Sequence, residues 1–595
     1  MDVKNEIIAS LKAAVRDLVF QGKTLERVES VLQTPKDQGH GDYSSNIALT
    51  LFANSRFKIQ DLRFKSPMEL AEEIAKKLNS SRSTLPNIDK VEAVKPGFIN
   101  FYLSKKHLVS NLEEILEKKE YGSKPQDLNK KALPVARLPA GQGRQVVVEY
   151  SSPNIAKPFT VGHLRSTIIG DAIANLLEAN GWKVYRDNHL GDWGTQFGKQ
   201  IYAIKTWGNE EKIEKSQNPV KELVALYVKL HEEAEKNPEL EEKAREWFKK
   251  LEEGNSEARR LWKKCVDWSL EEFKTIYEKL GVKFTENDGL GYGESFFEDK
   301  IKDILAELEE KKLLTDSEGA KLVFFEHDKL PPFMIIKKDG ATLYATRDLA
   351  TDKFRLGKYP GAKIINEVGV EQTLYFRQLF ELEKMLGWVK EGQRIHIKHG
   401  HYRFKNEKMS TRRGNTIWLK EVLEEAIRRA ENLGSEGKEI AEKVGIGALK
   451  WNDLKRSSNL DIVFDWDEIL NMQGNSGPYL QYAFARTQSV LAKVKSQKSK
   501  VKSTIQNSKV ENEEVSLLRS LYRFPEVVGE AAEKFAPNLL CNYLFDLAQK
   551  FNLFYQKHKI LDSDNQDFRL ILTKAAGEVI KKGLNLLGIS APEKM

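Results

Sequence analysis

The sequence predicts an α/β protein built around a parallel sheet, with a mixed α+β segment before this core and an all-α segment after it. Three observations predict this fold class: a strand–helix–strand pattern that begins at Val146, a charge-rich helical stretch at about 209–280, and helical periodicity from Asp461 to the C-terminus. A chain of 595 residues is too long for one compact core, so we expect about three domains.

Residues 1–119 are predicted to form the mixed α+β domain. The stretch NEIIASLKAAV has the apolar spacing of an amphipathic helix, and KVEAVKPGFINFYLS is typical of two strands joined by a turn at Pro96-Gly97. Residues 120–145 are polar and punctuated by Pro and Gly, which predicts a linker.

Residues 146–460 are predicted to form the α/β domain. VVVEY is typical of a strand, the residues from Leu164 to Ala179 have one apolar helical face, and KVYRDN is typical of a second strand. Asn180-Gly181 ends the helix, because glycine accepts the left-handed backbone of a helix C-terminus. Strand, crossover helix and strand in this order indicate a parallel sheet.

The other segments follow from charge and periodicity. The stretch 209–280 is predicted to be a helical insertion in the sheet domain. Strand-like runs resume in KLVFF, PFMIIK and AKIINEVGV, and residues 461–595 are predicted to be helical around a polar loop at 495–514.

The composition excludes several classes of protein. The net charge of +8 permits a polyanionic partner, although many ordinary enzymes are as basic. Cys265 and Cys541 are too few for a disulfide framework or a zinc ligand set, so we expect a cytoplasmic protein without zinc. There is no apolar run near 18 residues and no apolar leader, so we expect no membrane association.

Gly162 and His163 begin the predicted crossover helix, where free backbone N–H groups and the helix dipole attract anions. A histidine in this first turn can donate to a phosphate oxygen. A bare Gly-His pair is more often ordinary helix-start chemistry, so the pair alone decides nothing.

Two further clusters have charges that suit a substrate. FKNEKMSTRRGN gathers Lys408, Arg412 and Arg413 in a loop that can close on a triphosphate or simply be a solvated basic turn. Tyr344 and Asp348 lie four residues apart, hence on one helical face, and a carboxylate there can pair with a guanidinium. The alternative is that Asp348 pairs internally with Arg347 or Arg355.

Together these segments resemble class I aminoacyl-tRNA synthetases, and specifically arginyl-tRNA synthetases. SSPNIAKPFTVGHLRSTIIGD resembles that family's form of the "HIGH" signature, and KMSTRRGN resembles its "KMSK" signature. The likeness continues through NHLGDWGTQFG, GES, LYATRDLA, VGVEQ, GNSGPYLQYAFAR and LLGISAPEKM, while GHGDYSSNIAL and PGFINFYL resemble the family's extra N-terminal domain. The resemblance therefore covers nearly the whole chain.

The resemblance implies a Rossmann-like parallel-sheet catalytic domain, an α+β N-terminal domain that binds the tRNA elbow, and an all-α C-terminal domain that binds the anticodon. It implies an enzyme that joins L-arginine to ATP, with Mg²⁺, and releases pyrophosphate. The arginyl group would then pass to the 2′-hydroxyl of the terminal adenosine of tRNA(Arg). The family is usually monomeric, so we expect a monomer.

The resemblance also implies site residues, carried over by matching motifs. For arginine these are Ser152, Asn154, His163, Glu294, Tyr344, Asp348 and Gln372. For ATP they are Gly162, His163, Lys408, Met409, Ser410, Thr411 and Arg412. The catalytic group is His163, Lys408, Lys157 and Thr160, and no metal-binding residue is implied. The tRNA contacts are Phe98, Asn100, Phe101 and Tyr102 near the N-terminus and Tyr479, Gln481, Tyr482 and Arg486 near the C-terminus.

This sequence departs from the family's pattern at two positions. Thr160 stands where the first histidine of "HIGH" is expected, and Thr411 stands at the last lysine of "KMSK". The resemblance implies that Lys157 supplies the charge missing at the second position. A threonine hydroxyl can still donate one hydrogen bond, so we expect reduced rather than absent activity; alternatively, Thr160 only caps the helix.

Two other functions compete with this interpretation. The first is a different synthetase or nucleotidyltransferase with the same phosphate site, which the acidic pocket disfavours because it suits a guanidinium. The second is a non-catalytic tRNA-binding paralogue, which the joint presence of His163, Asp348 and Lys408 disfavours.

Overall fold

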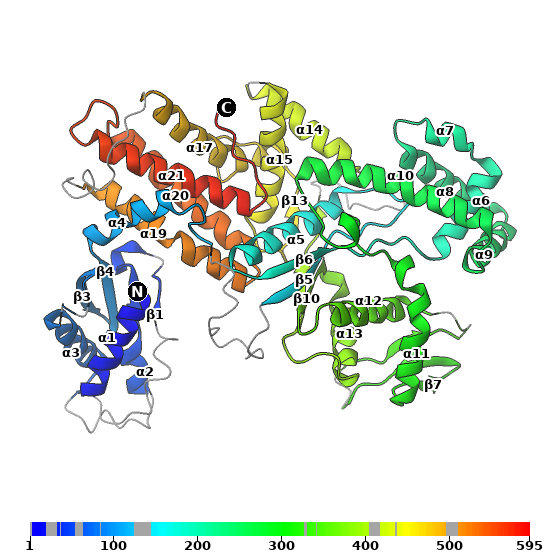
Figure 1. The fold of residues 1–595 in the computed structure, drawn as a ribbon, viewed down its shortest axis with the longest axis horizontal. Coiled ribbons are helices and arrows are strands. Elements are labelled where there is room, and N and C mark those ends of the chain that lie inside the picture. Colours follow the sequence, from blue (N-terminus) through cyan, green and yellow to red (C-terminus); the bar gives the residue numbers. More distant parts are fainter. Residues whose placement is uncertain are drawn as a thin grey trace. The chain divides into compact units, whose positions relative to one another are not determined.

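The computed structural model (Figure 1) describes residues 3–18, 32–35, 37–53, 64–81, 83, 85–123, 144–326, 330–338, 340, 342–403, 417–434, 437–494 and 510–595. The chain divides into two compact units. The first contains residues 1–121, 490–524 and 549–579, and the second contains residues 122–489, 525–548 and 580–595.

The N-terminal part of the first unit is an α+β domain, as the sequence predicts. Its antiparallel sheet has the strand order β1-β2-β4-β3. The strands are β1 (Leu32–Gln33), β2 (Tyr43–Ser45), β3 (Ile88–Val94) and β4 (Phe98–Leu103), and the helices are α1 (Val3–Leu18), α2 (Ile47–Ala53), α3 (Pro67–Ser80) and α4 (Lys105–Glu117).

The first unit also includes parts of the C-terminal helices. The Tyr121 ring stacks on Phe524 at 6.1 Å, and its hydroxyl donates to Asn111 Oδ1 at 3.0 Å and to the Leu521 carbonyl at 3.1 Å. The His107 ring meets the edge of Tyr522 at 5.3 Å. The N-terminal domain therefore shares its packing with helix α19 (Asn512–Glu533).

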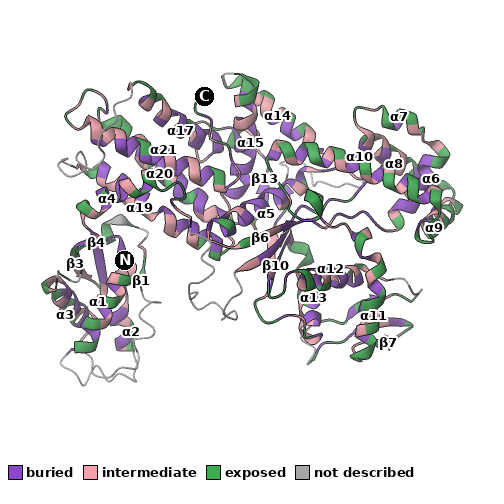
Figure 2. Cartoon of the chain, in the orientation of Figure 1, coloured by how far each residue is buried: buried purple, intermediate pink, exposed green. Residues whose placement is uncertain are grey.

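A four-stranded parallel sheet forms the centre of the second unit, in the order β11-β10-β5-β6. Its strands are β5 (Gln145–Glu149), β6 (Lys183–Asp187), β10 (Lys363–Gly369) and β11 (Arg394–His399). The two central strands, β5 and β10, are mostly buried, whereas most residues of the outer strand β11 are half-buried. Figure 2 shows the buried residues in purple, and burial of the central strands agrees with a parallel sheet covered on both faces.

Alternation along β5 and β6 assigns the two faces of this sheet. Tyr150, just after β5, packs on Gly170 of helix α5 (Val161–Ala179), where an added Cβ would lie 2.2 Å from the Tyr150 side chain. Glu149, one residue earlier, points to the opposite face and pairs with Arg355 of helix α12 (Tyr344–Lys358). Helices therefore cover both faces.

Helix α5 is the predicted crossover, and it begins three residues earlier than predicted because Thr160 is the N-cap residue. Thr160 has extended backbone angles, and its carbonyl accepts a hydrogen bond from the His163 N–H at 3.0 Å. At the other end Gly181 has φ +77°, which confirms the predicted left-handed termination.

The predicted helical insertion is confirmed. It consists of α7 (Glu210–Glu214), α8 (Pro219–Lys236), α9 (Glu239–Glu252) and α10 (Ser256–Leu280), which follow α6 (Thr195–Trp207). Asn209, Asn218 and Asn255 cap α7, α8 and α10, each accepting a hydrogen bond from a backbone N–H of the first turn.

Two of the later predicted strands lie outside the parallel sheet. β7 (Thr315–Ser317), β8 (Ala320–Val323) and β9 (Phe333–Ile336) form a separate antiparallel sheet. Phe333 and Ile335 of β9 pack in one apolar core with Leu349 of α12, Leu379 of helix α13 (Thr373–Met385) and Ile304 of helix α11 (Ile301–Glu310).

Helices dominate the rest of the described chain, as predicted, with a two-stranded parallel pair of β12 (Tyr402–Arg403) and β13 (Ile462–Val463) between them. The helices are α14 (Leu419–Asn432), α15 (Lys438–Leu454), α16 (Trp466–Ile469), α17 (Gly477–Ala492), α19, α20 (Pro537–Lys557) and α21 (Gln566–Leu586). Among the described residues, no helix is long and apolar enough to cross a membrane.

Candidate active site

The connections of the parallel sheet diverge between β5 and β10. From β5 the chain crosses through α5 to β6 on one side, and from β10 it crosses through α13 to β11 on the other. In parallel sheets of this kind, ligands bind beyond the carboxyl ends of the strands at such a switch point. A ligand site is therefore expected at the residues just after Glu149 and Gly369.

His163 lies in the first turn of α5 at this edge, and its hydrogen bonds fix its tautomer. The Thr160 N–H donates to His163 Nδ1 at 3.0 Å, so in the neutral ring Nδ1 is the acceptor and Nε2 carries the hydrogen. Burial lowers the pKa of His163 to about 4. At neutral pH the ring is therefore an uncharged donor, which suits a phosphate oxygen.

Thr160, at the start of α5, contacts the segment that follows the basic loop predicted at residues 404–415. Its hydroxyl lies 3.0 Å from His163 Nδ1, and Thr160 forms an antiparallel bridge with Trp418. The Leu419 N–H donates to the Phe159 carbonyl at 2.8 Å, and the Val161 N–H donates to the Ile417 carbonyl at 3.2 Å. Lys408, Met409, Ser410, Thr411, Arg412 and Arg413 lie outside the described residues.

Asp348 on α12 provides the negative charge of the candidate pocket. Its carboxylate accepts a hydrogen bond from the Tyr375 hydroxyl, and its Oδ1 lies 3.4 Å from His189 Nε2. The expected alternative partners are occupied elsewhere: Arg347 pairs with Glu298 (a 2.5 Å contact), and Arg355 with Glu149 and Asp187. The alternative of an internal Asp348–arginine pair is therefore wrong.

Glu294 is the second acid of the pocket and begins a 3₁₀ helix at Glu294–Lys300. It is buried, and its Oε2 has no hydrogen-bond partner in the described part of the chain. Burial raises the pKa of Glu294 to about 7. A buried carboxylate oxygen without a donor is costly, so this atom is suited to a ligand that supplies N–H groups.

Close packing at two glycines positions the Glu294 turn. A Cβ at Gly291 would lie 1.8 Å from Asn188 Oδ1, and one at Gly293 would lie 2.4 Å from Asp192 Oδ2. Asp192 also accepts from the Ser295 N–H at 2.7 Å. The turn thus sits directly against the loop that follows β6.

The remaining predicted arginine-site residues lie on neighbouring loops and helix starts. Ser152 Oγ accepts a hydrogen bond from the His189 N–H at 3.1 Å, and Asn154 is bridged to Gly191 through the backbone. Gln372 and Tyr344 are exposed, at the starts of α13 and α12 respectively. Tyr344 is 66% exposed, so its side chain is largely open to solvent.

Lys157 is half-buried in the loop before α5. Burial lowers the pKa of its amine, while the negative charge of Glu294 opposes this shift. The amine is thus within electrostatic reach of the acidic pocket. Gly162, one residue before His163, is exposed, and an added Cβ there would meet only the Thr160 hydroxyl, at 3.4 Å.

Sequence reasoning missed His189, Tyr375 and the His399–Glu367 pair. His399 Nδ1 lies 2.8 Å from Glu367 Oε1 at the ends of β11 and β10, and a charge on His399 further lowers the pKa of His163. The run NHLGDWG that contains His189 was available as a signal, because polar residues directly after a predicted parallel strand lie at the ligand edge.

The residues predicted to contact tRNA fall into two groups, one buried and one accessible to solvent. Phe101 and Asn100 are buried in the N-terminal sheet, where Asn100 Oδ1 accepts from Ser44 at 2.7 Å, so the prediction that these two side chains contact tRNA is wrong for this conformation. Gln481 is likewise buried, donating to the carbonyls of Lys443 and Ser590, and serves packing. Five candidates keep accessible surface: Phe98, Tyr102, Tyr479, Tyr482 and Arg486. The Arg486 guanidinium lies over the Tyr482 ring at 4.9 Å.

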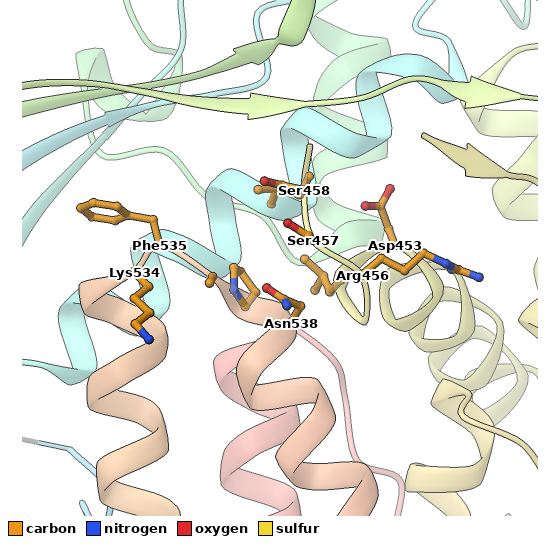
Figure 3. A pocket seen from close by; sticks show the side chains of 11 residues that line it. Asp453, Arg456, Ser457, Ser458, Lys534, Phe535 and Asn538 are labelled. Carbon is orange, nitrogen blue, oxygen red and sulfur yellow. The ribbon is translucent and has the colours of Figure 1, made fainter. Parts of the chain in front are cut away.

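A cavity of about 100 Å³ lies elsewhere in the second unit (Figure 3), between α5, the loop after α15 and the turn from α19 to α20. Its cations do not converge on a ligand: Arg456 donates to Glu468 and Asn452, and Lys534 pairs with Glu530. None of the predicted site residues lines it. We therefore place the site at the sheet edge and not in this cavity.

Among the described residues, no group of three or more His, Cys, Asp or Glu side chains is arranged to hold a metal ion.

Three family models match the chain. They are tRNA synthetases class I (R), catalytic domain, over residues 128–466; DALR anticodon binding domain, over residues 480–595; and Arginyl tRNA synthetase N terminal domain, over residues 4–103.

Similar proteins span the same length. The chain is 40% identical to an arginine–tRNA ligase of Clostridium perfringens, covering 100% of both chains, and 41% identical to one of Enterococcus faecalis, covering 99% of both. The structure resembles arginyl-tRNA synthetases of Plasmodium falciparum (TM-score 0.81, 24% identity, 100% of this chain and 99% of that one) and Thermus thermophilus (TM-score 0.75, 24% identity, 100% of both). The chain belongs to the arginyl-tRNA synthetase family of class I aminoacyl-tRNA synthetases.

Proposed function

We propose that this arginine–tRNA ligase performs both steps of its reaction at the carboxyl edge of β5 and β10. In the first step a carboxylate oxygen of L-arginine attacks the α-phosphorus of ATP, forming arginyl-adenylate and releasing pyrophosphate. In the second step the 2′-hydroxyl of the terminal adenosine of tRNA(Arg) attacks the arginyl carbonyl carbon, and AMP leaves. The observation that carries the proposal is the pairing of an acidic pocket, Asp348 and Glu294, with the neutral donor His163 at one sheet edge.

The arginine side chain binds in the acidic pocket in this proposal. Asp348 pairs with the guanidinium, and the unpartnered Oε2 of Glu294 accepts a second N–H. Tyr344 and Gln372 lie at the mouth of the pocket, and Ser152 and Asn154 receive the amino and carboxylate groups. A planar guanidinium with five donors can serve two carboxylates at once, which an ammonium cannot do in the same geometry.

The phosphates bind at the start of α5. Nε2–H of His163 donates to an α-phosphate oxygen, where charge develops as pyrophosphate leaves, and the free N–H groups at Gly162 add to this. Thr160 holds His163 in its donor tautomer through the backbone N–H. Lys157 and, beyond the described residues, Lys408, Met409, Ser410, Thr411 and Arg412 complete the phosphate site.

A divalent metal accompanies ATP in this reaction class, and we propose Mg²⁺ as that ion. Mg²⁺ commonly binds through substrate phosphates and few protein ligands, so the ATP phosphates would hold the ion.

The tRNA binds through both ends of the chain. We assign the elbow to residues 1–119, through Phe98 and Tyr102, and the anticodon to residues 461–595, with Tyr479, Tyr482 and Arg486 facing the nucleic acid. Residues 120–145 link the first domain to the catalytic domain at 146–460. We propose that the enzyme acts as a cytoplasmic monomer.

Arginine-dependent exchange of ATP and pyrophosphate, measured with and without tRNA(Arg), tests the proposal. We expect exchange with arginine and none with lysine. Exchange with another amino acid would indicate a different synthetase, and tRNA binding without any exchange would indicate a non-catalytic paralogue.

A further inference from the structure

His189, which follows β6, is a buried histidine with unused hydrogen-bonding capacity. Its side chain is 11% exposed, and neither ring nitrogen makes a hydrogen bond in the described part of the chain. The ring packs against Phe297 at 5.9 Å, and its backbone N–H is anchored on Ser152 Oγ at 3.1 Å. The imidazole is thus held in place beside the acidic pocket, and in the described part of the chain no uncharged group forms a hydrogen bond with its ring nitrogens.

Acidic groups face this ring from several elements. Asp348 of α12 is nearest, with its Oδ1 3.4 Å from Nε2, and Glu149 of β5, Glu294 of the 3₁₀ helix and Asp192 of the following loop are within electrostatic range. Tyr375 of α13 donates to the same Asp348 carboxylate. The surroundings of His189 are therefore strongly negative.

The nearby cations are already paired or distant. Arg355 is paired with Glu149 and Asp187, and Arg347 with Glu298, while the acid that acts electrostatically on Lys157 is Glu294. Among these groups, only His189 approaches Asp348 within 4 Å as a possible cation. Burying a carboxylate without a compensating charge is expensive, so the empty pocket favours an imidazolium.

We propose that His189 is a protonated counter-ion of Asp348 in the empty pocket, and that the arginine guanidinium replaces this charge and expels the proton. The inference rests on the proposed binding of the guanidinium by Asp348. Two cations cannot share this small acidic pocket without repulsion, whereas arginine keeps its charge at every accessible pH.

The proton that leaves is the one on Nδ1. Nδ1 is buried and has no acceptor among the residues that the structure describes, while Nε2 faces Asp348 Oδ1. After the Nδ1–H bond breaks, its electron pair stays on the ring and the proton passes to solvent. Neutral His189 then keeps Nε2–H toward Oδ1 while Tyr375 holds the same carboxylate. His189 is thus a positioning residue that orients Asp348 toward the guanidinium.

This arrangement also adds to specificity. Citrulline has nearly the shape of the arginine side chain but no charge, so it cannot replace the imidazolium and leaves its proton in place. A neutral analogue therefore forms no ion pair with Asp348, and it gains nothing from deprotonation of His189. Arginine alone obtains a pocket whose charge it balances.

Titration calorimetry of arginine at pH 8.0, with saturating tRNA(Arg) and in two buffers of different ionisation enthalpy, measures the released protons directly. Although burial disfavours the charged form, Asp348 raises the pKa of His189 to about 9, so about 0.9 of the sites carry this proton at pH 8.0. Glu294, with a pKa of about 7, is already mostly ionised there. We expect release of nearly one proton per arginine and none with citrulline.

His189→Gln removes the titrating group, and His231→Gln on α8 is the matched control. We expect the His189 variant to release fewer than about 0.2 protons, with His231→Gln unchanged. Between pH 7.5 and 8.5 the arginine Kd of the wild type should fall about 8-fold, because proton release is favoured at higher pH, and it should stay flat in His189→Gln. His189→Asn repeats the test if His189→Gln melts at a lower temperature.

Two results would overturn the inference: arginine binding without proton release in the wild type, or equal release in the folded His189 variants. The Asp348→Asn variant separates an error in the counter-ion inference from an error in the proposed arginine pocket. If Asp348→Asn loses arginine binding but the wild type releases no proton, the pocket assignment stands and the counter-ion is wrong. If Asp348→Asn binds arginine normally, or if the wild type binds none, the proposed pocket itself is wrong.

Discussion

Asp348→Asn removes the charge that we assign to arginine recognition while keeping the size of the side chain. In the structure the carboxylate is about one-quarter exposed, accepts from Tyr375 and lies 3.4 Å from His189. A hydrogen bond to a charged group contributes roughly 1.5–3 kcal/mol, which corresponds to about a 10- to 150-fold rise in arginine KM. ATP should bind nearly as before, because the phosphate site lies at the start of α5.

The assay is arginine-dependent pyrophosphate exchange with tRNA present, at varied arginine and then at varied ATP. Asp303→Asn on α11 is the matched control, since it removes an exposed carboxylate away from the pocket. Melting temperatures should agree among the three proteins. An unchanged arginine KM in well-folded Asp348→Asn would refute the assignment, and an equal rise in ATP KM would show that the substitution disturbs the whole edge.

Further substitutions test the phosphate site and the tRNA-binding surface. Lys408→Ala should lower kcat more than it raises the ATP KM, because a lysine that stabilises developing charge contributes mainly in the transition state. A raised ATP KM with an intact kcat would mean that Lys408 only binds ATP in the ground state. Thr160→Val should slow exchange, but by less than the 10²–10³-fold that follows loss of a principal oxyanion donor, because the backbone N–H of residue 160 still fixes the His163 ring. Full activity in Thr160→Asp would exclude a direct contact between Thr160 and a phosphate, and helix capping would then be the role of this residue. Phe98→Ala should weaken tRNA binding in a filter assay by about 1–3 kcal/mol at unchanged melting temperature, and buried Phe101→Ala should instead lower the melting temperature; the reverse pattern would reject the elbow assignment.

Local sequence patterns were sufficient for the crossover unit. β5, α5 and β6 follow from β-branched runs, one apolar helical face and Gly181 at positive φ, all of which are encoded within about 40 residues. His163 could be placed at the ligand edge for the same reason, because a crossover helix must begin where its strand ends.

Long-range pairing explains what the sequence could not predict. The partners of Asp348 are Tyr375 and His189, which lie 27 and 159 residues away in the chain, whereas helical spacing suggested Arg347 or Arg355. Phe101 could not be assigned either. It shares the buried face of β4 with Ile99 and Leu103, while Phe98 and Tyr102 on the other face are partly exposed. Alternation separates these two sets, but the sequence alone does not show which set faces the core. His107 packs against Tyr522 of α19 at 5.3 Å, and Arg519 of α19 lies 3.3 Å from Asp42, so removing residues 1–119 would also uncover α19. Point variants therefore test tRNA binding more cleanly than a truncation.

The central claim is that arginine is activated at the carboxyl edge of β5 and β10. A crystal structure with a non-hydrolysable arginyl-adenylate analogue tests it most directly. We expect the guanidinium within hydrogen-bonding distance of the Asp348 carboxylate and Glu294 Oε2, and the phosphate mimic within hydrogen-bonding distance of His163 Nε2. An analogue seated in the cavity between α5 and the α19–α20 turn, or one whose guanidinium lies away from both acids, would contradict the account.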